Sequence, residues 1–75
     1  MTEQELHTAK KKFGKNVQRI RKEKEMSLLD VSYNCSLGDG RISEIEHGKF
    51  NVTLGTILEL AKGLEITPSR LLDFS

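Results

Sequence analysis

The sequence predicts an all-α fold made of five short helices. Apolar residues recur every three or four positions through most of the chain, which is the period of an amphipathic helix. Residues that favour helix ends, such as Ser27, Gly48 and Thr53, stand at the boundaries of these stretches. No segment shows the apolar–polar alternation of a β-strand. We expect residues 1–75 to form a single domain with a small core.

The first expected element is a long amphipathic helix over about residues 3–25. Its apolar positions share one face: Leu6, Ala9, Phe13, Val17 and Ile20. Gly14 is a mild weak point within this helix, because glycine costs about 1 kcal/mol relative to alanine in a helix interior. Residues 1–12 form an N-terminal extension of the helix, ahead of the motifs that follow.

Residues 27–48, SLLDVSYNCSLGDGRISEIEHG, contain two short helices separated by a tight break. Ser27 with Asp30 three residues later predicts a capped start, and the helix is expected over about 28–35. The glycines of the Gly38–Gly40 segment interrupt it, and a second helix begins at Gly38 or Asp39 and ends at Gly48. Four residues are expected to face inward: Val31, Cys35, Ile42 and Ile45. This is the outline of a helix-turn-helix, whose second helix normally lies in the DNA major groove.

Two further helices are expected after the loop 49–52. Thr53 caps a helix with one apolar face, formed by Leu54, Ile57, Leu58, Ala61 and Leu64. Thr67 and Pro68 give a cap and a proline at the first helical position of a short last helix. That helix extends to Phe74 and bears Leu71, Leu72 and Phe74.

The charge distribution is asymmetric although the formal net charge is only +1. Residues 10–24 hold eight basic residues against the single acid Glu23, so the rest of the chain carries −6. Such a segment is typical either of a surface that faces nucleic acid or of a solvated lysine-rich helix face. The single cysteine, Cys35, excludes an intramolecular disulfide, and no apolar run approaches a membrane span. We therefore expect a cytoplasmic protein that does not enter a membrane.

The chain resembles the phage-repressor/Cro-type (Xre) family of helix-turn-helix regulators. The resemblance covers Phe13 to Phe74 and rests on three segments: FGKNVQRIRKEKEMS, RISEIEHGK and NVTLGTILELAKGLEITPSRLL. It implies a compact five-helix, lambda-repressor-like DNA-binding domain with its helix-turn-helix over about 27–48. It also implies a regulator of transcription that binds a double-stranded DNA operator as a dimer. The sequence leaves open a restriction–modification controller, a phage repressor or an antitoxin.

The resemblance assigns roles to three sets of residues. Arg21 and Glu46 match a pair that forms a structural ion pair in relatives. The positions matching DNA-phosphate contacts are Ser27, Leu28 at the N-terminus of the next helix, His47, Lys49 and Asn51. The positions matching base contacts are Asp39, Gly40, Arg41 and Glu44, with Ser43 as a helper. Many relatives have glutamine at the position of Leu28, and leucine cannot replace its polar contacts.

Arg41 is the strongest candidate for a base contact. Its guanidinium can donate two hydrogen bonds to guanine O6 and N7, which discriminates by about 1–3 kcal/mol. The alternative role for Arg41 is a phosphate contact. Asp39 and Glu44 can only accept, so each could pair with cytosine N4, and Glu44 could instead be a partner of Arg41 or a lysine. Gly38 and Gly40 offer no side chain but let the backbone approach DNA closely.

Other classes of function find less support in the sequence. His7 and His47 stand far apart without a cluster at metal-ligand spacing, so we expect no metal, no cofactor and no catalytic site. A homodimer is expected to pair through the C-terminal part, with five residues that could equally be monomer core: Leu58, Leu64, Ile66, Leu72 and Phe74. The rival hypothesis is a protein-interaction module that keeps the fold without specific DNA binding, suggested by the acidic, glycine-rich segment around Asp39.

Overall fold

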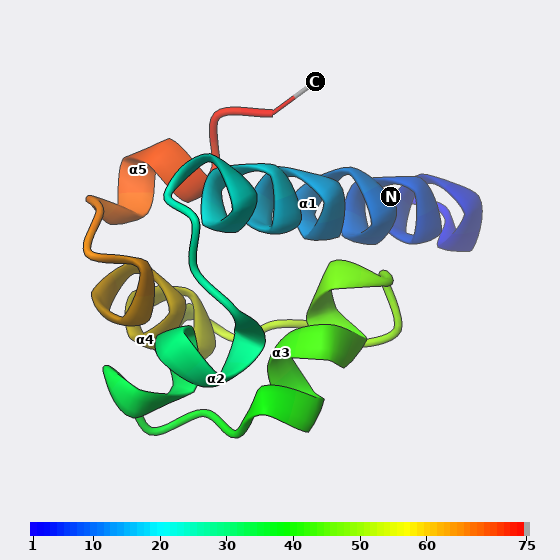
Figure 1. Ribbon diagram of the computed structural model, residues 1–75. Helices are drawn as coiled ribbons and strands as arrows, with labels where there is room; N and C mark the ends of the chain where they lie inside the picture. Colours follow the sequence, from blue (N-terminus) through cyan, green and yellow to red (C-terminus); the bar gives the residue numbers. More distant parts are fainter. Residues whose placement is uncertain (75) are drawn as a thin grey trace.

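The computed structural model describes residues 1–74 and contains five α-helices and no strand in that range. The helices are α1 (Glu3–Glu23), α2 (Leu28–Tyr33), α3 (Asp39–Glu46), α4 (Leu54–Leu64) and α5 (Pro68–Leu71). Helices α2, α3 and α4 lie together on one side of α1, and α5 packs at the C-terminal end of α1 (Figure 1). The N-terminal turns of α1 extend past the other helices (Figure 1). The all-α prediction is confirmed.

The predicted helix bounds differ from the observed ones mainly at the C-terminal ends. Helix α1 ends at Glu23 and α2 at Tyr33, each two residues earlier than predicted. Helix α5 ends at Leu71, so Phe74 lies outside it and packs its ring edge-on against Phe13 with centroids 5.9 Å apart. Helix α3 begins after Gly38 and is followed by Gly48 at φ 73°, as predicted.

Each helix contributes to one core. The buried apolar residues are Phe13, Val17, Ile20, Val31, Ile42, Ile45, Leu60, Ala61, Leu64 and Leu71. Cys35 is only half-buried, and its thiol donates to the Val31 carbonyl. The apolar face predicted for α4 is only partly covered, because Leu54 is 70% and Leu58 47% exposed. Leu72, after α5, is 52% exposed.

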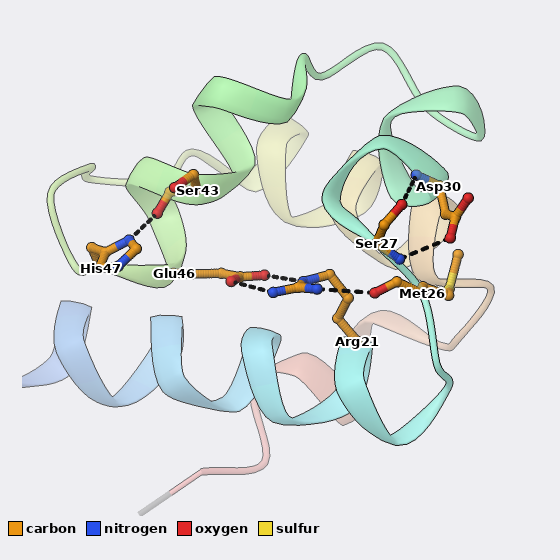
Figure 2. A network of polar contacts seen from close by, with 7 residues as sticks. All are labelled: Arg21, Met26, Ser27, Asp30, Ser43, Glu46 and His47. Atoms are coloured by element: carbon orange, nitrogen blue, oxygen red, sulfur yellow. Dashed lines mark hydrogen bonds and ion pairs between the residues drawn. The ribbon is translucent and has the colours of Figure 1, made fainter.

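A capping box begins α2, as the sequence predicts. The Asp30 backbone N–H donates to Ser27 Oγ at 3.0 Å, and the Ser27 N–H donates to Asp30 Oδ2 at 2.8 Å (Figure 2). The Ser27 backbone N–H, followed by the Ser27 hydroxyl, holds the pKa of the Asp30 carboxyl below its usual range, because both hydrogen bonds stabilise the charged form. Thr2 and Glu5 form an equivalent box at the start of α1, which the sequence analysis did not identify.

The turn between α2 and α3 is fixed by α4. The Glu59 carboxylate accepts the Ser36 N–H at 2.8 Å, and the Asn34 amide donates to the Gly63 carbonyl at 3.3 Å. Gly63 itself lies against Val31, where an added Cβ would come within 2.9 Å of the Val31 carbonyl oxygen. The break within the helix-turn-helix is therefore a defined turn attached to the next helix.

Two glycines let α1 and the C-terminal end of α3 touch at their backbones. A Cβ on Gly14 would collide with the carbonyl oxygens of Ile45 and Glu46. A Cβ on Gly48 would come within 3.0 Å of the Lys11 Cα. Gly14 therefore has a packing role beside its predicted cost to the helix, because the missing side chain allows the two helices to approach so closely.

An ion pair closes the same junction. The Arg21 guanidinium donates from Nε to Glu46 Oε2 at 2.7 Å and from Nη2 to Glu46 Oε1 at 3.0 Å (Figure 2). Its Nη1 donates to the Met26 carbonyl at 2.9 Å. The Glu46 side chain is only 2% exposed and the Arg21 side chain 11%. The hydrogen bonds that the guanidinium donates to the Glu46 carboxylate raise the pKa of Arg21, because they stabilise its charged form.

We expect Gly14→Ala to destabilise the protein by about 1–3 kcal/mol, the usual cost of forcing extra volume into packed structure. The matched control is Gly55→Ala in α4, where the nearest atom to an added Cβ is Thr53 Oγ1 at 3.8 Å. That control is expected to be neutral or stabilising by up to about 1 kcal/mol, because alanine is the better helix former. Urea unfolding measures both. A Gly14→Ala protein as stable as wild type would contradict the close approach of α1 and α3.

We expect Glu46→Gln to lower the free energy of unfolding by about 3 kcal/mol, because it leaves the guanidinium of Arg21 uncompensated in a nearly buried site. The control is Glu23→Gln, which breaks the exposed pairs of Glu23 with Arg19 and Arg70 and should cost less than about 1 kcal/mol for each pair. Urea unfolding of the two variants is compared. If both variants lose the same free energy of unfolding, burial does not make the stability depend more strongly on the Arg21–Glu46 pair.

Candidate nucleic-acid interface

Helix α3 presents its N-terminal half to solvent because its apolar residues point into the core. Ile42 and Ile45 are buried, whereas Asp39, Gly40 and Arg41 are exposed. A Cβ built on Gly38 or Gly40 would have no neighbouring atom within 4 Å. The backbone at the start of α3 is therefore open to approach by a large ligand.

Arg41 is held by two neighbours on the surface. Its guanidinium carbon lies 4.0 Å from the centroid of the Phe50 ring, a cation–π arrangement. Its Nε donates to Glu44 Oε1 at 3.2 Å. Within residues 1–74 no hydrogen-bond acceptor engages the two terminal nitrogens, so both N–H₂ groups of Arg41 are available to a ligand.

This arrangement contains one of the two contacts that the sequence left open for Glu44, and the base-contact role stays a prediction. Glu44 is a partner of Arg41, as one of its two interpretations held. The stacking of Phe50 on Arg41 was not predicted, because the loop 47–51 was matched only to phosphate-contact positions. An aromatic residue shortly after a helix with an exposed arginine was the available signal, although spacing alone does not show that the loop folds back over α3.

The residues assigned to phosphate contacts occupy the ends of α2 and α3. The Ser27 hydroxyl oxygen accepts from the Asp30 backbone N–H, and Ser27 is exposed at the start of α2. The Leu28 side chain packs against the core, so only its backbone is placed for a polar contact. Lys49 and Asn51 are exposed on the loop after α3.

His47 is oriented by the helix that it follows. Its Nδ1 lies 2.7 Å from the Ser43 carbonyl oxygen (Figure 2), so Nδ1 carries the proton and donates. The other ring nitrogen, Nε2, is left for a different partner. Ser43 is half-buried and takes part through its backbone in this contact.

The Arg21–Glu46 pair lies between two of the residues assigned to phosphate contacts. Figure 2 shows His47, the Arg21–Glu46 pair and Ser27 in a row between α1 on one side and α2 and α3 on the other. Arg21 joins the row to the start of α2 through the Met26 carbonyl. Asp39, Lys49 and Asn51 make no side-chain hydrogen bond or ion pair with another residue of the described chain, so they are not held in place in the same way.

Neither a metal site nor a membrane span is found in the described part of the chain. No three histidine, cysteine, aspartate or glutamate side chains of residues 1–74 are grouped to hold a metal ion. None of the helices in this range combines the length and the apolar character needed to cross a bilayer.

Comparisons with known proteins agree with this geometry. Residues 17–71 match a family model described as helix-turn-helix. The control protein C.BamHI of Bacillus amyloliquefaciens is 41% identical over 64 residues, which cover 84% of this chain and 79% of that protein.

Solved structures of restriction–modification controller proteins have the same fold. C.AhdI from Aeromonas hydrophila is 31% identical with a TM-score of 0.81, over 87% of this chain and 94% of that one. The controller C.Esp1396I has been solved as a tetramer in complex with its natural 35 base-pair operator. It is 29% identical with a TM-score of 0.79, over 87% of this chain and 86% of that one. The chain therefore belongs to the helix-turn-helix family of phage-repressor/Cro (Xre) type.

Proposed function

We propose that the protein is a sequence-specific DNA-binding regulator of transcription of the restriction–modification controller kind. It binds an operator as a homodimer and places α3 in the major groove. The observation that carries this proposal is the exposed N-terminal half of α3, with Arg41 held against Phe50 and Glu44 and its two terminal nitrogens unoccupied. The similarity to C.BamHI, C.AhdI and the operator-bound C.Esp1396I supports the choice of controller among related regulators.

Base contacts follow from the chemistry of α3. Arg41 donates from its two terminal nitrogens to guanine, while Glu44 keeps Nε engaged and limits the rotation of the side chain. Pre-orientation reduces the entropy that the arginine loses on binding. Gly40 has no side chain and lets the backbone of α3 approach the bases closely. Asp39 accepts a hydrogen bond from cytosine N4, and Ser43 adds a secondary contact.

Backbone contacts fix the register of the domain on the duplex. The proposed contacting groups are the Ser27 hydroxyl, the backbone N–H groups from Leu28 onward, the His47 ring, the Lys49 ammonium and the Asn51 amide. These contacts supply affinity without sequence information. In the proposed mechanism the protein occupies an operator and thereby blocks or recruits polymerase. It acts in the cytoplasm and turns over no substrate.

A homodimer supplies the specificity that one α3 lacks, because a single half-site of three or four base pairs carries little information. The exposed leucines of the C-terminal part are the proposed interface: Leu54 and Leu58, one turn apart on α4, and Leu72 after α5, which packs on α4. Leu64 is fully buried in the protomer core, which removes it from the interface.

The rival hypothesis is a protein-interaction module without specific DNA binding. The acidic side chains at Asp39 and Glu44 favour it, because they repel phosphates. The pairing of Glu44 with Arg41 weakens that argument, since the carboxylate charge is compensated within α3.

Selection of binding sites from a random DNA library at about physiological salt tests the proposal. We expect enrichment of an inverted repeat whose half-sites lie about one helical turn apart, because two copies of α3 in a symmetric dimer contact the same face of the duplex. The control is Glu46→Gln, chosen at a temperature where it remains folded, which should enrich the same motif more weakly. A folded wild-type protein that enriches no motif would favour the interaction module.

A further inference from the structure

The N-terminal half of α1 carries positive charge that the helix-turn-helix itself does not account for. The family model begins at residue 17, so the lysines at 10, 11, 12 and 15 precede it. Lys11, Lys15, Gln18 and Lys22 lie along one stripe of α1, since they are spaced four, three and four residues apart. Lys11 and Lys15 are exposed.

Backbone contacts hold this stripe beside the end of α3. Gly48 lies directly against Lys11, and Gly14 lies against the last carbonyls of α3. The side chains of Lys11, Lys15, Gln18, Glu46 and His47 line a shallow hollow of about 260 Å³. We call Lys11, Lys15, Gln18 and His47 the α1 shelf.

The charge of the shelf is positive although Glu46 is among its lining residues. Glu46 is buried and its carboxylate receives two hydrogen bonds from Arg21, so its charge is compensated. Lys11 and Lys15 have no such partner among the ion pairs of the described residues. They are separated by about 6 Å along α1, and each ammonium stands on a long flexible stem. The shelf is therefore suited to successive anionic groups on an extended ligand.

The position of the shelf identifies the ligand. Figure 2 shows the His47 and Ser27 side chains at the two ends of the nearly buried Arg21–Glu46 pair, beside α1. In the proposed function, Ser27 and His47 meet DNA phosphates. Because Gly48 lies against Lys11, DNA that contacts His47 comes close to the N-terminal half of α1. This inference rests on the proposed function.

We propose that the α1 shelf binds phosphates of the DNA backbone that flank the operator half-site. The Lys11 and Lys15 ammonium groups donate to phosphate oxygens. The Gln18 amide and the His47 ring are further donors beside them. The shelf extends the contact region beyond the helix-turn-helix without adding sequence preference. It gives a role to two of the eight basic residues in positions 10–24.

The test compares Lys11→Gln/Lys15→Gln with the wild type in DNA binding over a range of salt concentrations. Three duplexes are used: the selected operator trimmed at its edges, the same operator extended by one helical turn on each side, and a scrambled sequence of the extended length. On the two long duplexes, the slope of log Kd against log salt concentration should be shallower for the variant than for the wild type. The expected difference is about 0.9 for each lost contact, or about 1.8 per protomer. On the trimmed duplex the variant and the wild type should bind alike.

The matched control is Lys12→Gln/Lys62→Gln, which removes the same charge from exposed residues away from the shelf. This control is expected to keep the wild-type slope of log Kd against log salt concentration, apart from a small change that is the same on all three duplexes. Thermal unfolding confirms that both double variants remain folded.

Unchanged slopes for the shelf variant on both long duplexes, or equal slope changes in the control, would overturn the proposal. Failure of the proposed function has a different signature, which is equal binding of operator and scrambled duplex by the wild type. A slope difference on the scrambled duplex would then still support phosphate binding by the shelf.

Discussion

The junction between α1 and α3 is the constraint on which the rest of the structure depends. Gly14 lets the two backbones meet, and the Arg21–Glu46 pair joins them with two hydrogen bonds in a site nearly closed to water. A buried pair of this kind contributes little net stability over apolar residues, yet losing one partner is costly. Its value here is geometric, because it admits one orientation of α3 on α1.

That orientation connects the core to the surface that would meet DNA. With Ile42 and Ile45 buried, Arg41 and Glu44 lie on the exposed side of α3, and the loop returns Phe50 beneath the guanidinium. Arg21 also bonds to the Met26 carbonyl, one residue before the capping box of α2. A single side chain therefore fixes the relative positions of the start of α2 and the end of α3, and with them the proposed phosphate contacts at Ser27 and His47.

Much of the fold could be predicted from local sequence signals, whereas contacts between distant segments could not. The capping box at Ser27 and the glycine end at Gly48 depend on neighbouring residues, so their patterns are visible in the sequence. The stacking of Arg41 on Phe50 and the close approach at Gly14 depend on how helices pack, and spacing does not encode that. The exposure of Leu54 and Leu58 could not be predicted for the same reason, since an apolar stripe does not say how much of it the remaining helices cover. The Arg21–Glu46 pair was predicted through family resemblance, which carries tertiary information.

The most direct measurement is the affinity of wild type and Arg41→Ala for a set of operators in which each half-site base pair is changed in turn. The account predicts that wild type loses about tenfold or more in affinity at one position of each half-site, where Arg41 contacts guanine, and that Arg41→Ala binds all bases there equally. At the other positions the two proteins should show the same preferences. An Arg41→Ala protein that keeps the wild-type preference at every position would contradict the assignment of Arg41 as the base-contacting residue.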